Sequence, residues 1–84
     1  MNSKQRKIWS SIFTNPIPRN LTWNDLLFLL KNIGCDVIEG DGSRVGFEYK
    51  GRRLDLHRPH PGKEIKPYQV KAVREFLKVL EVKP

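Results

Sequence analysis

The sequence predicts an α+β fold in which a three-stranded antiparallel sheet packs on two helices, in the order α-β-β-β-α. Residues 44–49 and 52–57 alternate apolar and polar side chains, which is the period of a strand with one buried face. Residues 22–33 and 67–80 carry apolar side chains at the three- and four-residue spacings of a half-buried helix. With both helices on one face of the sheet, the other face is expected to stay open.

Residues 1–21 precede this arrangement and are interpreted as a helical extension followed by a proline-containing linker. A helix over residues 3–13 would gather its apolar side chains on one stripe. These side chains are Ile8, Trp9, Ile12 and Phe13. Pro16 and Pro18 then interrupt the helical pattern, because proline lacks the backbone N–H that a helix needs. The domain itself is expected to span residues 22–84.

The first helix of the domain is predicted over residues 22–33. The hydroxyl of Thr22 can cap its first turn, and Asp25 suits the positive end of the helix dipole. Gly34 is well placed to end the helix. Its buried stripe consists of Leu26, Leu29, Leu30 and Ile33. A short strand is expected directly afterwards, over residues 36–39.

The next two strands are predicted to form a hairpin with a two-residue turn at Lys50–Gly51, because glycine readily adopts the positive φ of such turns. This turn length fixes the register of the two strands. The apolar pairs would be Val45–Leu56 and Phe47–Leu54. On the polar face, Arg44 would lie opposite His57, and Glu48 opposite Arg53. A longer turn would change all of these pairs.

The open face of the sheet is expected to carry polar and small side chains. They are Arg44, Gly46, Glu48, Arg53, Asp55 and His57. A glycine in the middle of a strand, such as Gly46, indicates either a bulge or the close approach of a ligand. After His57, Pro59 and Pro61 exclude regular strand pairing. The last helix is predicted over residues 67–80, with Val70, Val73, Leu77 and Leu80 as its buried stripe.

The charge of the chain favours a polyanionic partner. Sixteen Lys and Arg residues against nine acidic residues give a net charge of +7 and a pI of about 9.9. This excess suits RNA, DNA or an acidic protein, and the alternative is a solvated surface that is simply basic. We expect no membrane association and no signal peptide, because every apolar run is short. The single Cys35 allows no internal disulfide and is typical of a cytoplasmic protein.

Several short motifs follow one another from Trp23 to about Leu80. They are LLKNIGCDV (29–37), GDGS (40–43), RVGFEY (44–49), KGRR (50–53), HRPHP (57–61), KEIKP (63–67) and VKAVREFL (70–77). In order and spacing this series resembles the HicA toxins of bacterial type II toxin–antitoxin systems. The resemblance implies a fold like the double-stranded-RNA-binding domain and a ribosome-independent endoribonuclease that cuts mRNA. It also implies a HicB-type antitoxin as partner, and no cofactor is expected.

One position departs from the family pattern. Many HicA proteins carry a catalytic histidine at the start of the second strand, and alignment on KGRR places Arg44 there. Arginine cannot act as a general base near neutral pH, but it can bind a phosphate and stabilise charge. In a first hypothesis His57 is the base, Arg44 stabilises the phosphate, and His60 protonates the leaving oxygen.

Two alternatives to this nuclease stay open. In one, the domain binds RNA or its antitoxin without cutting, and His57 and His60 are merely polar residues of a proline-rich loop. In the other, the chain is a basic adaptor that binds only protein. A steep salt dependence of RNA affinity would separate that adaptor from the first two hypotheses.

Further basic residues are candidates for contacts with RNA phosphates. They are Arg52, Arg53, Arg58, Lys63, Lys66 and Lys71. For each, the alternative is an exposed, ion-paired side chain, and Glu48 opposite Arg53 favours this for Arg53. No metal site is predicted, since no Cys or carboxylate cluster completes a ligand set around His57 and His60. Asp55 is a candidate to orient His57.

Overall fold

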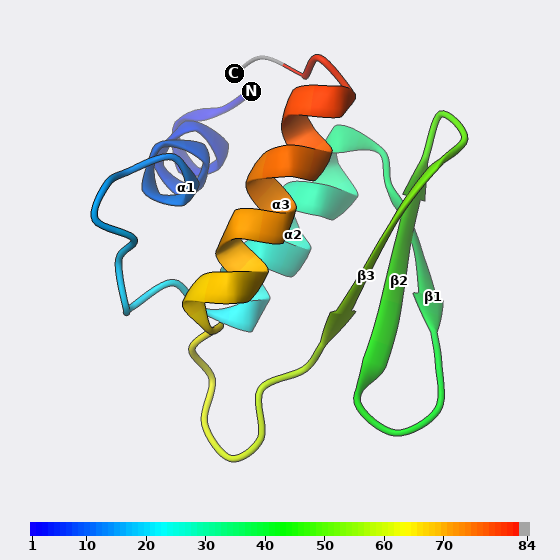
Figure 1. Cartoon of the computed structure of the whole chain (residues 1–84). Coiled ribbons are helices and arrows are strands. Elements are labelled where there is room, and N and C mark those ends of the chain that lie inside the picture. The colour runs from blue at the N-terminus through cyan, green and yellow to red at the C-terminus, as the bar shows by residue number, and fades with distance from the viewer. Residues whose placement is uncertain (83–84) are drawn as a thin grey trace.

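The computed structural model describes residues 1–82 and has the predicted α-β-β-β-α order behind one extra helix. The elements are α1 (Ser3–Ile12), α2 (Trp23–Ile33), β1 (Asp36–Glu39), β2 (Arg44–Tyr49), β3 (Arg52–His57) and α3 (Pro67–Val79). The sheet is antiparallel in the order β1-β2-β3, and α2 and α3 cover one of its faces (Figure 1). The predicted α+β fold of the double-stranded-RNA-binding-domain type is confirmed.

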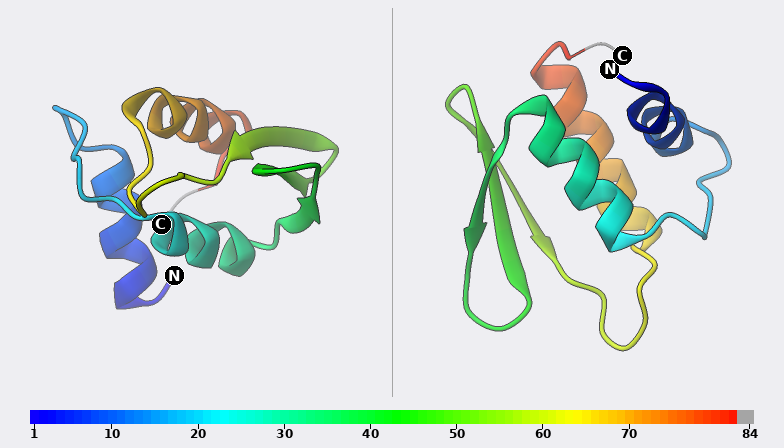
Figure 2. Two further views of the ribbon diagram at one scale, coloured as in Figure 1. Left: turned by 90° about the horizontal axis from the view of Figure 1, so that it is seen from below. Right: turned by 180° about the vertical axis from the view of Figure 1, so that it is seen from behind.

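Helix α1 forms a third layer on the side of α2 and α3 that faces away from the sheet (Figures 1 and 2). It therefore leaves the open face of the sheet uncovered. Asn2 and Gln5 cap its start reciprocally, with N···O distances of 2.7 and 2.8 Å. Ile12, at its end, is 0% exposed in the common core. The helix ends one residue earlier than predicted.

The end of α1 is held by an arginine of α3. Arg74 of α3 donates hydrogen bonds to the backbone oxygens of Ile12 and Thr14, at 2.5 Å each, and to Asn15 Oδ1 at 2.9 Å. The last carbonyls of a helix have no partner within it, and here a guanidinium supplies one. The partners of Arg74 come from a segment about 60 residues away in the chain, so no local pattern predicts these contacts.

The core lies between the sheet and the helices. Side chains of β2 and β3 that point inward, such as Phe47 and Leu56, meet the apolar stripes of α2 and α3. Its fully buried members are Phe47, Ile12, Leu26, Leu29, Leu30, Leu56, Leu77, Val45, Val70 and Val73. The helical stripes predicted from spacing are thus largely confirmed. Leu80, which was predicted in the α3 stripe, is only partly buried, because α3 ends at Val79.

The hairpin register is the one predicted. Arg44 pairs with His57, and Tyr49 with Arg52, across a turn in which Lys50 and Gly51 have φ of 49° and 76°. Positive φ at both central residues matches the right-handed twist of the strands. The caps of α2 are also as predicted: the Thr22 hydroxyl accepts the Asp25 N–H at 3.1 Å, and Gly34 ends the helix.

The missing side chain of Gly46 makes room for Arg53 and does not mark a bulge. Pairing runs without interruption from Ile38 through Gly46 to Asp55. A Cβ on Gly46 would lie 2.5 Å from an Arg53 guanidinium nitrogen, so the arginine occupies the space that a side chain would need. The bulge that the sequence offered as one reading is therefore wrong, and Arg53 fills the space that the other reading assigned to a ligand. The glycine lets Arg53 lie flat across the open face of the sheet.

Candidate active site

The candidate site lies at the end of the hairpin opposite its turn, where Arg44 begins β2 and His57 ends β3. The backbone N–H of His57 donates to Gln69 Oε1 at 2.8 Å, and its carbonyl accepts from Gln69 Nε2 at 3.0 Å. The His57 backbone therefore turns toward α3 and away from β2. In such a non-hydrogen-bonded pair the two Cα atoms are only about 4.5 Å apart, so the Arg44 and His57 side chains start close together.

The imidazole of His57 is exposed and held by one neighbour. Its Nδ1 lies 3.2 Å from the hydroxyl of Ser43. When Nδ1–H donates to this hydroxyl, Nε2 carries the free lone pair and can accept a proton from a substrate. Asp55 does not orient the ring, contrary to the interpretation above, because its carboxylate accepts from Arg53 at 2.9 Å.

Ser43 was not among the predicted site residues, although the predicted register already places it near His57. Continuing the hairpin one pair beyond Arg44–His57 brings Ser43 opposite Arg58. The structure has this contact, with the Arg58 N–H donating to the Ser43 carbonyl at 2.8 Å. Gln69 carried no such signal. Its position in the sequence indicates only that it belongs to the last helix. Its side chain is 4% exposed because it reaches across the helix–sheet interface to β3.

Arg44 and Arg58 differ in how much of their charge is free. Within residues 1–82 the Arg44 guanidinium makes no ion pair or hydrogen bond, and the side chain is exposed. Arg58 contacts both carboxylate oxygens of Glu39, at 2.5 and 2.6 Å. This hydrogen bond lowers the pKa of the Glu39 carboxyl below its usual range. Arg44 is therefore the cation beside His57 that can meet an anionic group.

The model of the family described as HicA toxin of bacterial toxin-antitoxin systems matches residues 23–82. The chain belongs to the HicA toxin family. Comparison with curated proteins and with solved structures gave no match. The match begins at Trp23, so α1 and the linker lie outside the part that the family model covers. The division of the chain at residue 21 stays a prediction.

Two of the predicted phosphate contacts of this HicA-family chain lie far from His57. Arg52 and Arg53 begin β3, so five residues of extended strand, about 17 Å, separate Arg52 from His57. Arg53 is paired with Glu48 at 3.0 Å and with Asp55 at 2.9 Å. The hydrogen bonds that Arg53 donates to Asp55 and to Glu48 raise the pKa of its guanidinium. Its positive charge is thus largely matched by two carboxylates.

Four other predicted residues lie between β3 and α3 or on α3, and all four are exposed. They are His60, Lys63, Lys66 and Lys71. The loop that carries the first three is anchored at both ends. Arg58 holds its start, and near its end the Ile65 N–H donates to the Leu21 carbonyl at 2.9 Å while Trp23 N–H donates to the Lys63 carbonyl at 2.8 Å.

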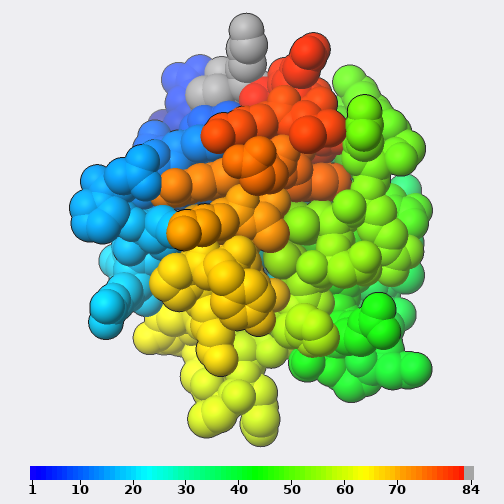
Figure 3. Space-filling view, viewed as in Figure 1, coloured from blue at the N-terminus to red at the C-terminus, as the bar shows by residue number. Residues whose placement is uncertain are grey.

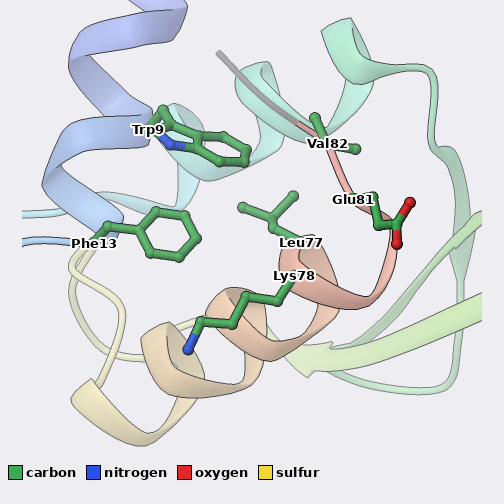
Figure 4. A pocket seen from close by; sticks show the side chains of 6 residues that line it. All are labelled: Trp9, Phe13, Leu77, Lys78, Glu81 and Val82. Atoms are coloured by element: carbon green, nitrogen blue, oxygen red, sulfur yellow. The ribbon is translucent and has the colours of Figure 1, made fainter.

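Other features of the HicA-family chain lie away from this site. A cavity of about 630 Å³ opens between α1 and the end of α3 and is lined by Trp9, Phe13, Leu77, Lys78, Glu81 and Val82 (Figure 4). None of the predicted site residues lines it. Within residues 1–82, no three His, Cys, Asp or Glu side chains lie close enough together to hold a metal ion. No helix in this described part is long and apolar enough to cross a bilayer.

Proposed function

We propose that this HicA-family chain is an endoribonuclease that cuts mRNA at the Arg44–His57 site. The observation that carries the proposal is an exposed imidazole, held at Nδ1 by Ser43, directly across the hairpin from a guanidinium that makes no ion pair with residues 1–82. A proton acceptor beside a fixed positive charge is what attack on a phosphodiester requires. The net charge of +7 supports a polyanionic substrate.

The proposed reaction uses the substrate's own 2′-hydroxyl as the nucleophile. Nε2 of His57 takes the proton from this hydroxyl, and the 2′-oxygen forms a new bond to the adjacent phosphorus. Arg44 stabilises the negative charge that builds up on the phosphate oxygens. The bond from phosphorus to the 5′-oxygen breaks, and protonated His60 gives that oxygen a proton. The products are a 2′,3′-cyclic phosphate and a free 5′-hydroxyl.

Incubating the purified protein with an mRNA transcript and with its fully 2′-O-methylated copy tests this function. The transcript should be cut to fragments with cyclic phosphate ends, and the methylated copy should stay intact because it has no proton to give. The His57→Ala variant should cut at least about a hundredfold more slowly than the wild type, which is the usual effect of removing a general base. Equal cutting of both RNAs, or by both proteins, would refute the proposed mechanism.

A binding module without nuclease activity is the second candidate, and Arg44 is the observation that favours it. In the family resemblance this position holds the catalytic histidine, so an arginine is also what a lost active site would leave. Such a module would bind the transcript without cutting it, and Arg44→His would restore cutting. If the wild type cuts the transcript and Arg44→His does not increase the cutting rate, the binding module without nuclease activity is excluded.

We place a HicB-type antitoxin as the protein partner and the cytoplasm as the location. The family context supports the first, because HicA toxins are components of toxin–antitoxin systems. The free, buried thiol of Cys35 supports the second, since reducing compartments preserve free cysteines. Co-expression with the neighbouring gene product should suppress RNA cutting and yield a stable complex. An uninhibited toxin in that experiment would contradict this partner.

A further inference from the structure

The start of α3 carries an exposed aromatic side chain that no part of the fold requires. Tyr68 is 62% exposed, whereas Gln69 and Val70 beside it are buried. Because Val70, Val73 and Leu77 supply the helix's buried stripe, Tyr68 contributes nothing comparable to the core. Its hydroxyl makes no hydrogen bond to residues 1–82.

Tyr68 is the chain neighbour of a residue that contacts the candidate site. It directly precedes Gln69, whose amide holds both backbone groups of His57 at 2.8 and 3.0 Å. The loop and first turn of α3 (yellow) and the end of β3 (green) form one continuous surface in Figure 3. Arg44 and His57 lie on the open face of the sheet, so a strand of RNA whose phosphate meets them reaches the first turn of α3 by passing the edge of β3.

The surroundings of Tyr68 distinguish between an RNA base and a protein surface. Lys66 lies two residues before it and Lys71 three residues after it, and both are exposed. Among residues 1–82, the other exposed large apolar side chains are Ile38 and Val79, at 36% and 52%. Val79 is eleven residues along α3, about 17 Å away, and Ile38 lies on β1, the edge strand farthest from β3, so Tyr68 is not part of an apolar patch with either. A lone aromatic ring among cations suits a base and its flanking phosphates.

We propose that Tyr68 stacks on an unpaired base of the RNA next to the phosphate held by Arg44 and His57. The proposal rests on the function proposed above and narrows its substrate to single-stranded RNA. A base within an A-form duplex is already stacked on both faces and offers none to a protein side chain. A fold of the double-stranded-RNA-binding-domain type would by itself suggest duplex RNA as the substrate. The exposed ring of Tyr68 instead favours single-stranded RNA.

Binding of a labelled, 2′-O-methylated single-stranded oligonucleotide tests this assignment without cutting. Tyr68→Ala should weaken affinity about tenfold or more, whereas Tyr68→Phe, which keeps the ring, should bind as the wild type does. Val79→Ala, at the other end of the same helix, is the matched control and should change nothing. The slope of affinity against salt should be the same for wild type and Tyr68→Ala, because the phosphate contacts remain.

The outcomes separate this proposal from the proposed function. If Tyr68→Ala binds the single strand as the wild type does while His57→Ala still abolishes cutting, the stacking proposal is overturned and the nuclease stands. An equal loss with a duplex of the same sequence would also overturn it. If Tyr68→Ala weakens capture by the antitoxin and leaves RNA affinity intact, Tyr68 is a protein contact. A wild type that neither binds nor cuts RNA removes both proposals together.

Discussion

At the scale of single residues, the chemistry assigned to His57 depends on three neighbours that come from different elements. Ser43 precedes β2 and holds the ring, Arg44 begins β2 and supplies charge, and Gln69 of α3 fixes the backbone. Gln69 is a buried polar side chain with both ends of its amide bonded, which is the only arrangement that makes such burial inexpensive. The strand end that carries His57 is thereby tied to a helix.

Replacing Ser43 tests whether its hydroxyl positions the imidazole. Ser43→Ala removes the partner of Nδ1, so the ring can rotate and change tautomer. We expect RNA cutting to fall about tenfold with little change in RNA affinity, while Ser43→Thr, which keeps the hydroxyl, should retain most activity. The two variants are compared by cutting rate at saturating protein. Equal activity of the alanine variant and the wild type would show that the contact has no role.

The thiol of Cys35 provides a residue-scale test of burial. Desolvation and then the charge of Asp36 raise its pKa from 9.0 to about 11. The folded state thus favours the neutral thiol. Its contribution to stability is complete below pH 9 and is lost as the pH rises through about 11, because the unfolded chain ionises first.

Alkylation by iodoacetamide measures this effect. At pH 8 the folded protein should react far more slowly than the same protein in denaturing urea, since the thiolate is the reacting form and the side chain is buried. The urea-unfolded sample is the matched control because it contains the same thiol without the burial. Similar rates in the two samples would mean that Cys35 is accessible in the native state.

At the scale of elements, local patterns and long-range contacts differ in how far the sequence determines them. The hairpin register follows from the two-residue turn and the alternation on either side, and both are visible in the residues themselves. The placement of α1 behind α2 and α3 does not follow from any local pattern. It depends on Ile8 and Ile12 reaching a shared core and on Arg74 meeting the end of the helix.

Replacing Arg74 tests how firmly α1 is attached. Arg74→Met keeps much of the stem but leaves the Ile12 and Thr14 carbonyls without their donor, and we expect a loss of about 1–3 kcal/mol in the free energy of unfolding. Lys71→Met, an exposed lysine on the same helix, should cost less than about 0.5 kcal/mol. Urea denaturation measures both. If the two variants lose the same free energy of unfolding, the hydrogen bonds from Arg74 to the end of α1 contribute nothing specific.

At the scale of the whole molecule, the fold was predictable and the site only in part. The order of elements, the open sheet face and the Arg44–His57 pair follow from periodicity. Ser43 lies one pair beyond the predicted strands, so the alternation does not reach it, and the role of Gln69 depends on how α3 packs on β3. Arg53 forms ion pairs with Glu48 and with Asp55, and the sequence predicted only the pair with Glu48, which lies directly opposite it.

The basic character of the molecule is unevenly distributed as a result. Arg53 and Arg58 are matched by carboxylates, while Arg44 and the lysines before and within the first turns of α3 remain exposed. The free positive charge near His57 therefore begins with Arg44 at one end of the open face and continues along the loop and α3, while the middle of that face carries the neutralised Arg53. This distribution fits a substrate that passes from the hairpin end onto α3.

The measurement that tests the central claim most directly is the integrity of total mRNA after induction in a bacterial host, with wild type and His57→Ala expressed to equal levels. A nuclease that works through His57 predicts growth arrest and loss of mRNA with the wild type only. Circular dichroism of the purified variant shows that it is folded. Loss of mRNA with both proteins would assign the base to another residue, and intact mRNA with both would contradict the nuclease itself.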